Sequence, residues 1–357
     1  MDLFTPFDCR DVTARNRVMV SPMCQYSCED EDGLATDWHL VHLGSRAAGG
    51  AGIVMSEATA VTPRGRISPK DLGIWSDDHA DALAPVTEFI AEQGATSAIQ
   101  LAHAGRKAST NRPGDGGGPV HGDRGWTPVG PTTEPWPHDE PLSTERLDAA
   151  DIERITEAFT EAAVRAVDAG FDIVELHAAH GYLLHEFLSP VTNTREDDYG
   201  GSFENRTRFL REVVVSVREA IPEGTPLFVR ISATDWLPDR ESWTVDDSTR
   251  LAAELRPLGV DLIDVSAGAI HPDQQVPDTG PHYQVPYAEQ VAESGVPVGT
   301  VGKITTPEGA DEIIRNGRAA LAIVGREHLR DPYFALHAAE SLGYELPVPR
   351  QYTRGFQ

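Results

Sequence analysis

The chain alternates short apolar runs with longer amphipathic segments, and this unit repeats eight times along the sequence. Short runs in which nearly every residue is apolar are typical of parallel strands that are covered on both faces. Helical patterns between the runs, such as 149–169 and 203–220, supply the connections that parallel strands require. The predicted strands are 17–21, 52–57, 97–101, 172–177, 227–231, 262–266, 298–301 and 320–325.

Eight such units predict an α/β fold, a (β/α)8 TIM barrel, formed by a single domain over residues 1–357. The alternative is a doubly wound open sheet, but a GxGxxG motif would then follow the first strand, and the sequence has none there. Segments 103–143 and 267–284 are longer than plain connections and follow the third and sixth strands. Both follow strand ends on the active face of a barrel, so we expect extended active-site loops.

The formal net charge is −26, with 56 acidic residues against 30 basic ones. Such a field repels nucleic acid and anionic membranes, so neither is expected as a partner. Lysine occurs only at Lys70, Lys107 and Lys303. A lysine-poor acidic surface favours adaptation to high salt, because salt screens the self-repulsion of the carboxylates. An ordinary acidic cytosolic protein is the alternative.

Cysteine usage indicates a reducing compartment. Cys9, Cys24 and Cys28 form no CxxC pair and no even-numbered disulfide framework. The amino terminus shows no basic patch followed by an apolar stretch, and the sequence has no apolar run of membrane-spanning length. We therefore expect a cytoplasmic location.

The strongest chemical signal is the segment HAAHGY, which contains His177, His180 and Tyr182 and leaves the fourth predicted strand. Two imidazoles that converge there can donate hydrogen bonds to a carbonyl oxygen and stabilise an oxyanion, and the phenol can donate a proton. Two alternatives stay open. One is a metal site that adds His185 and Glu186, and the other is a structural histidine pair.

The same histidine spacing occurs at His39 and His42, in a helical segment after the first strand. That pair lies away from a strand end, so structural packing is the interpretation we favour for it. Spacing alone therefore does not identify a clamp, meaning a histidine pair that binds a carbonyl oxygen. The position of His177 and His180 at the end of a barrel strand does.

Segments after other strands suit a flat ring ligand. The first strand ends in Ser21, Pro22, Met23 and Cys24, where a break at proline exposes backbone amides on the active face. The Cys24 thiol could tune the redox potential of a ring, although an inert buried cysteine is the commoner case.

Two polar residues inside apolar strands point to the same ligand. The amide of Gln100 can donate and accept together, which matches the pyrimidine edge of a flavin. Arg230 is a charge within an apolar run and must be paired. It could form an internal ion pair with Glu175 or Asp264, or it could supply a cation near the flavin N1–O2 edge.

The last two strands end at Gly302 and at Gly325-Arg326. Barrels often bind phosphate in the loops after strands seven and eight, through backbone amides and a basic side chain. One phosphate site without a dinucleotide loop indicates a mononucleotide. Lys303 is a candidate for a further phosphate contact.

Taken together, these segments resemble the old yellow enzyme family, and within it the bacterial YqjM-like class. The likeness covers nearly the whole chain. It rests on SPMCQYS at 21–27, EATAV at 57–61, IQLAHAGRKA at 99–108, GFDIVELHAAHGYLLHEFLSPVTNTREDDYGGSFENRTRFLREV at 170–213, PLFVRIS at 226–232, GVDLIDVSAG at 259–268 and GREHLRDP at 325–332.

The resemblance implies FMN as cofactor and assigns roles by position. Residues implied to contact FMN are Ser21, Pro22, Met23, Cys24, Ala58, Gln100, Arg230, Gly325 and Arg326. Residues implied to face the substrate are Tyr26, His177, His180 and Tyr182, with Tyr182 as proton donor, and Lys107 matches a lysine near the flavin. Arg354 matches an arginine that reaches the active site of a neighbouring subunit, which implies a homodimer or homotetramer.

The implied activity is an ene-reductase. NADPH or NADH would reduce FMN and leave, and an α,β-unsaturated carbonyl compound would then accept hydride at its β-carbon in a ping-pong cycle. Larger relatives that act on dienoyl-CoA or amines carry further flavin domains and a cysteine cluster, which are missing from this sequence. A rival from another class is a metal-dependent barrel lyase or aldolase with the histidines as ligands.

Overall fold

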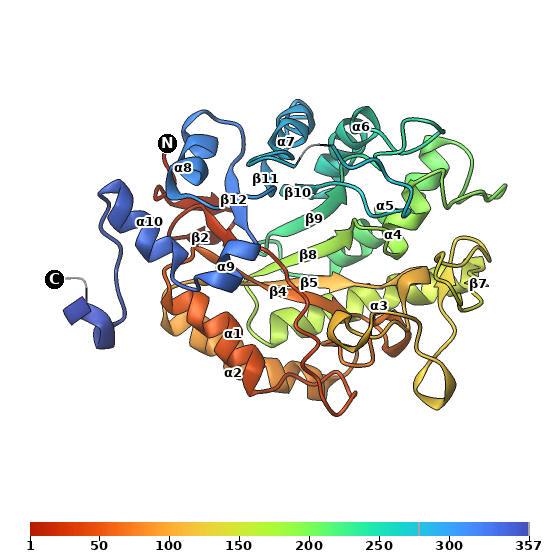
Figure 1. Ribbon diagram of the computed structural model, residues 1–357, viewed down its shortest axis with the longest axis horizontal. Coiled ribbons are helices and arrows are strands. Elements are labelled where there is room, and N and C mark those ends of the chain that lie inside the picture. Colours follow the sequence, from red (N-terminus) through yellow and green to blue (C-terminus); the bar gives the residue numbers. More distant parts are fainter. Residues whose placement is uncertain (278, 356–357) are drawn as a thin grey trace.

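The computed structural model describes residues 1–277 and 279–355, and its centre is a closed barrel of parallel strands (Figure 1). Going round the barrel, the strands follow the order β10-β11-β12-β3-β4-β5-β8-β9, which confirms the predicted TIM barrel. Their bounds are Val18–Val20 (β3), Ile53–Ala60 (β4), Thr96–Ala102 (β5), Ile173–Ala178 (β8), Leu227–Ser232 (β9), Leu262–Ser266 (β10), Val298–Thr300 (β11) and Leu321–Val324 (β12).

Helices surround the barrel (Figure 1). They are Asp37–Ala48 (α1), Asp77–Glu92 (α2), Ala149–Asp168 (α3), Leu183–Leu188 (α4), Phe203–Ala220 (α5), Val245–Leu255 (α6), Val285–Ala292 (α7), Pro307–Arg315 (α8), Arg326–Arg330 (α9) and Phe334–Leu342 (α10). Local sequence sets where they begin. The Asp148 carboxylate accepts from the Asp151 amide ahead of α3, and the Ser202 hydroxyl accepts from the Asn205 amide ahead of α5.

The amino-terminal end of the barrel interior is apolar. Inward residues such as Met19, Ile173 and Phe228 form one buried cluster there. A hairpin of β1 (Phe7–Cys9) and β2 (Val12–Ala14) packs on this cluster through Phe7 and Ala14. The hairpin therefore closes this end of the barrel with apolar side chains.

A polar layer follows toward the carboxyl ends of the strands. Successive strand residues point to opposite faces, so Glu175 and Arg230 share the inward face with Ile173 and Phe228. Strand register aligns Glu175 with Gln100, and Arg230 with both His177 and Asp264. Functional side chains are thereby brought to one end of the barrel from distant parts of the sequence.

Two details differ from the strand prediction. Strand β4 continues to Ala60, past the predicted end at residue 57, because a register shift between Met55 and Ala58 lets pairing with β5 resume. The long 103–143 segment contains 3-10 turns and the short strand β6 (Val129–Gly130), which pairs with β7 (Glu145–Arg146). Within 1–277 and 279–355, no helix has the length and apolar character to cross a membrane.

Candidate active site

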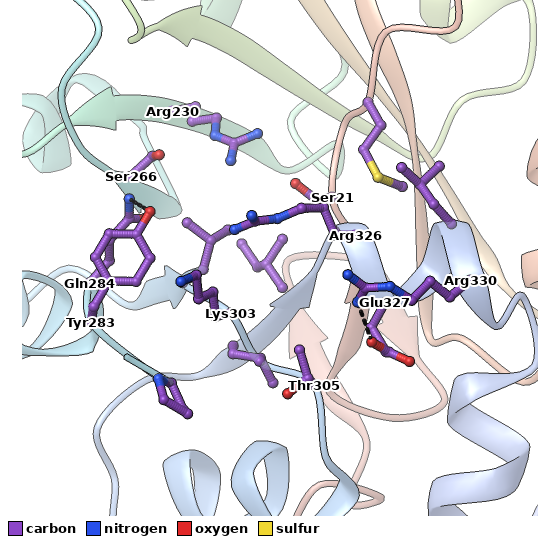
Figure 2. Close-up of a pocket in the computed structure, with 18 residues that line it drawn as sticks. Ser21, Arg230, Ser266, Tyr283, Gln284, Lys303, Thr305, Arg326, Glu327 and Arg330 are labelled. Atoms are coloured by element: carbon purple, nitrogen blue, oxygen red, sulfur yellow. Dashed lines mark hydrogen bonds and ion pairs between the residues drawn. The ribbon is translucent and has the colours of Figure 1, made fainter. Parts of the chain in front are cut away.

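A pocket of about 400 Å³ opens at the carboxyl ends of β3, β10, β11 and β12 (Figure 2). Its size is within the range of small-molecule and cofactor sites. It brings together seven of the residues singled out in the sequence, namely Ser21, Met23, Arg230, Gly302, Lys303, Gly325 and Arg326. These residues come from four separate segments, as expected of a site built from the strand ends and loops of a barrel.

One side of the pocket is cationic. Arg326 lines it, and Figure 2 shows this residue beside Ser21 and opposite Tyr283. Lys303 also lines the pocket, but its ammonium donates to Thr279 Oγ1 at 2.7 Å, so the amine is held by the loop before α7. Arg330, at the edge, is paired with Glu327 at 2.8 Å. Arg326 is therefore the cation best placed for an anionic ligand group.

The geometry fits a mononucleotide. A Cβ built on Gly325 would meet no protein atom closer than 3.6 Å, so its contacts would be ordinary van der Waals ones and this glycine is not required by close packing. Its nearest neighbours there are Ser21 and Met23, which also line the pocket. Arg230 lies in the pocket lining as well, and its buried Nε is in ion-pair contact with Asp264 but has no aligned hydrogen bond among the described residues. A phosphate near Arg326 and a polar ring edge near Arg230 would satisfy both guanidinium groups.

The polar layer beneath the site is internally paired. Gln100 Nε2 donates to Glu175 Oε1 at 2.8 Å, and Arg230 Nε lies 3.2 Å from Asp264 Oδ2. Burial raises the pKa of both Glu175 and Asp264, and the Arg230 charge opposes this rise in each case. Of the two partners predicted for Arg230, the structure selects Asp264. Arg230 is both ion-paired and at the pocket, so its two interpretations, an internal ion pair and a cation near the flavin edge, are compatible.

The structure brings the two histidines and the tyrosine together. The ring centroids of His177 and His180 lie 5.2 Å apart at 89°, and those of His177 and Tyr182 lie 4.9 Å apart at 85°. The Ala179 amide donates to His177 Nδ1 at 3.2 Å, so a neutral His177 carries its proton on Nε2. That nitrogen is then a hydrogen-bond donor for a ligand.

The electrostatic environment keeps the pair neutral. Burial, then the charge of Arg230, lowers the pKa of both His177 and His180 well below the usual histidine value. Burial also raises the pKa of the Tyr182 phenol, so its proton is retained. His180 Nε2 lies 2.7 Å from Ser266 Oγ. Two neutral imidazoles beside a protonated phenol can bind a carbonyl oxygen and supply a proton.

Lys107 lies behind this group. Its Nζ donates to the backbone oxygens of His180 at 2.7 Å and Ala269 at 2.5 Å, and it lies 4.1 Å from the Trp136 ring centroid. Burial, then the charge of Arg106, lowers the pKa of Lys107 to about 7. The structure thus places this amine against the main chain of the histidine turn.

The segment after β3 forms a second wall. Burial raises the pKa of the Cys24 thiol, which contacts the Ala58 backbone and the Tyr26 side chain. Ala58 and Tyr182 also line a smaller cavity with Asp71. Cys24, Tyr26, Ala58 and Tyr182 are therefore neighbours, although they come from separate parts of the sequence.

Some predicted residues lie outside the pocket. Gln100 contributes to the polar layer below, and the pocket lining also lacks Pro22, Cys24, Tyr26, Ala58, Lys107, His177, His180 and Tyr182. Arg354 is on the exposed 3-10 segment Arg350–Gly355, which projects from the body of the molecule (Figure 1). Sequence reasoning missed Ser232 and Ser266, whose hydroxyls contact His180. Both serines are the last residue of a barrel strand, and this position is the signal that could have identified them.

His185 and Glu186, the further metal-ligand candidates, lie on α4 as expected and have other partners. His185 Nε2 lies 3.1 Å from Asp235 Oδ1, and Glu186 accepts from the Arg106 amide at 2.8 Å. Across the described ranges, no three His, Cys, Asp or Glu side chains gather in a metal-ligating arrangement. The other pair, His39 and His42, is buried in α1, where His39 Nε2 lies 3.3 Å from Glu57 Oε1.

Comparison with known proteins agrees with a flavin-binding site at this end of the barrel. The family model described as the NADH:flavin oxidoreductase / NADH oxidase family matches residues 2–345. The chain is 47% identical over 356 residues to an NADPH dehydrogenase of Geobacillus thermodenitrificans, covering 99% of this chain and 98% of the relative. It is 48% identical over 353 residues to an NADPH dehydrogenase of Bacillus cytotoxicus, covering 99% and 96%.

Solved structures are similar as well. Morphinone reductase in complex with tetrahydroNAD superposes with a TM-score of 0.77 at 27% identity, covering 99% of this chain and 94% of that one. The old yellow enzyme homologue from Zymomonas mobilis superposes with a TM-score of 0.78 at 26% identity, covering 98% and 94%. A 2-naphthoyl-CoA reductase complex reaches 0.87 at 26% identity over 95% of this chain, which spans about half, 52%, of that longer chain.

Proposed function

Because the chain belongs to the NADH:flavin oxidoreductase / NADH oxidase family, we propose that it reduces the C=C bond of α,β-unsaturated carbonyl compounds at the expense of NADPH or NADH. FMN is the cofactor of this chemistry. When bound, FMN takes hydride from the reduced nicotinamide and passes it to the β-carbon of the acceptor.

The observation that carries the proposal is that the buried rings of His177 and His180 meet beside Tyr182 at the end of β8. Each neutral imidazole keeps one N–H, and it carries no positive charge that the nearby Arg230 would repel. In a buried site such donors stabilise the negative charge that develops on a carbonyl oxygen when hydride adds to the conjugated bond. The pair would hold the carbonyl and orient the acceptor, and Tyr182 would donate the proton to its α-carbon.

The residues proposed to hold FMN come from the pocket lining and from the strands and segments next to it. Arg326, with the backbone at Gly302 and Gly325, would bind the phosphate, and Lys303 would add positive charge. Arg230 would face the ring edge where reduction leaves negative charge, and Gln100 would supply polar contacts from below. Ser21 to Cys24, together with Ala58, would line the opposite side. Tyr26 and Lys107 would complete the acceptor side.

Anaerobic spectroscopy tests this function. Purified protein is expected to be yellow, to bleach with NADPH or NADH, and to regain its colour when a cyclic enone is added, with the saturated ketone as product. Colourless protein whose activity depends on a divalent metal would contradict the proposal and support the lyase or aldolase alternative.

Two finer assignments are proposals about context. We place the chain in the YqjM-like class, in the cytoplasm of a salt-adapted organism, supported by the 170–213 stretch and the net charge of −26. We also propose a homodimer or homotetramer in which Arg354 reaches a neighbouring active site. Residues 350–355 are exposed in the isolated chain, which is consistent with a segment that another copy covers.

A further inference from the structure

The turn that carries His180 has an unusual backbone. His180 and Gly181 adopt consecutive positive φ values of 59° and 71°. Such a conformation is strained for histidine and must be imposed by its surroundings. A side chain at position 181 is also excluded, because its Cβ would lie 2.3 Å from the Ala269 oxygen. The orientation of His180 therefore depends on whatever holds this turn.

Three polar backbone groups at the centre of the turn have identified partners. The His180 amide donates to Ser232 Oγ at 2.9 Å, and the His180 oxygen accepts from Lys107 Nζ at 2.7 Å. The Gly181 amide donates to His185 Nδ1 at 2.9 Å. His185 is fully buried, so water cannot replace it as the acceptor.

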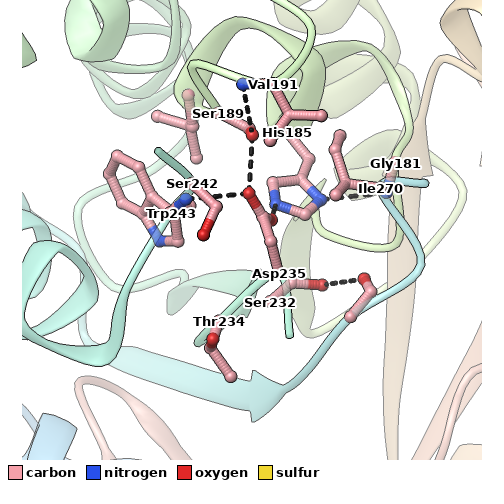
Figure 3. Close-up of polar contacts among 12 residues, drawn as sticks. Gly181, His185, Ser189, Val191, Ser232, Thr234, Asp235, Ser242, Trp243 and Ile270 are labelled. Atoms are coloured by element: carbon pink, nitrogen blue, oxygen red, sulfur yellow. Dashed lines mark hydrogen bonds and ion pairs between the residues drawn. The ribbon is translucent and has the colours of Figure 1, made fainter. Parts of the chain in front are cut away.

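His185 is in turn held by a buried carboxylate (Figure 3). Its Nε2 lies 3.1 Å from Asp235 Oδ1, an ion-pair contact rather than an aligned hydrogen bond, and neither atom has a hydrogen-bond partner elsewhere among the described residues. Both side chains have zero exposure. The other oxygen, Oδ2, accepts from Ser189 Oγ at 2.6 Å and from the Trp243 amide at 2.8 Å. Asp235 thus joins the loop after β9 to helix α4 through His185.

We propose that His185 and Asp235 form a positioning pair for the clamp, that is, for His177 and His180, which would bind the acceptor carbonyl. Asp235 keeps the His185 proton on Nε2, and this leaves Nδ1 free to accept from the Gly181 amide. Neither residue touches the acceptor, and both act through the shape of the 180–181 turn. The inference rests on the proposed function, since the clamp is the feature that the pair positions.

An isosteric substitution tests this directly. In Asp235→Asn, the amide oxygen stays on Ser189 and Trp243, and the amide NH2 faces His185. The ring must then accept at Nε2 and carry its proton on Nδ1, where it opposes the Gly181 N–H. We expect holoenzyme of this variant to retain FMN, to bind 4-hydroxybenzaldehyde at least tenfold more weakly by the flavin absorbance change, and to show a raised KM for cyclohexenone with a smaller change in kcat.

Asp311→Asn is the matched control. Asp311 is also a largely buried carboxylate, but its Oδ1 accepts from the Leu3 amide at 3.0 Å, near the amino terminus of the chain. This variant is expected to lose stability and keep the wild-type ligand affinity. Equal affinity in Asp235→Asn and wild type would overturn the inference. A wild-type enzyme that neither bleaches with NADPH or NADH nor binds the phenol would instead contradict the proposed function.

A measurement on the wild-type holoenzyme covers the case in which Asp235→Asn does not fold. Long-range ¹H–¹⁵N spectra with labelled histidine, assigned with His185→Gln, report the tautomer. The inference requires a neutral His185 with its proton on Nε2. A proton on Nδ1, with or without one on Nε2, would overturn it.

Discussion

The imidazole of His177 stands almost perpendicular to the phenol ring of Tyr182, at 85° and with 4.9 Å between ring centroids. The groups proposed to bind the carbonyl oxygen and to donate the proton are therefore adjacent and differently aimed. Carbonyl binding and protonation of the α-carbon need groups at two positions on the same small molecule. This relationship separates the roles of the two residues and makes each testable alone.

Tyr182→Phe should slow reoxidation of the reduced enzyme by an enone by about 10²-fold, as expected when a general acid is removed. Reduction by NADPH should change little, because no proton from Tyr182 is needed there. Stopped-flow absorbance of each half-reaction makes the comparison. If reoxidation keeps its wild-type rate, the proton comes from solvent.

The double variant His177→Ala, His180→Ala should keep FMN and lose affinity for enones and phenols by roughly 10–100-fold, the value of one to two hydrogen bonds to a charged oxygen. Titration of the flavin spectrum with a phenol measures the loss. The pair His39→Ala, His42→Ala has the same spacing on α1 and serves as control. Similar losses in both variants would argue against a clamp at His177 and His180.

Arg326→Ala should weaken FMN binding by about 10–100-fold, because a charge-assisted contact to phosphate is lost. Arg330→Ala is the control at the edge of the same pocket, where Glu327 already pairs with the guanidinium, and less than a threefold effect is expected. Fluorescence titration of apoprotein with FMN gives both dissociation constants. A larger effect at Arg330 would move the phosphate site.

Glu186→Gln should change how stability depends on pH. Burial raises the pKa of Glu186 to about 8 from 4.5, so the folded state holds this proton more tightly than the unfolded state. Wild-type stability from this group is complete below pH 4.5 and is lost as the pH rises through about 8. The Gln variant should gain roughly 2–4 kcal/mol over wild type between pH 4.5 and 8.5. Urea unfolding at both values, with Glu157→Gln on the exposed face of α3 as control, tests this.

Salt should stabilise the protein. Helix α2 exposes Asp78, Asp81, Glu88 and Glu92, and their i,i+3 and i,i+4 spacings place like charges side by side, at about 0.2–0.5 kcal/mol per pair. Tm is expected to rise between 0.1 and 3 M KCl, and to rise less steeply when all four become amides. A variant with the same slope as wild type would assign the salt effect to other sites.

The barrel was predictable because each strand is a short, continuous apolar run, and β10 was predicted to the residue at 262–266. The partner of Arg230 was open, since β8 and β10 both flank β9 and each carries an inward carboxylate beside it. The contact between His185 and Asp235 was beyond reach for another reason. These residues are 50 positions apart, by their numbers, and meet only when the loops after β8 and β9 pack together. Local patterns carry no information on such a contact.

The hairpin of β1 and β2 gives the barrel a floor, because Phe7 and Ala14 seal the apolar cluster at the amino-terminal end. A molecule that binds near His177, at the carboxyl end of the barrel, must therefore leave by the same end. Under the proposed function, in which reductant and acceptor use one site in turn, an oxidised nicotinamide would block the acceptor until it has left, and a tightly held product would block the next reductant. Because one end of the barrel is closed, both ligands would enter and leave at the other end. The residence time of each ligand, as much as its chemistry, would then set the turnover rate.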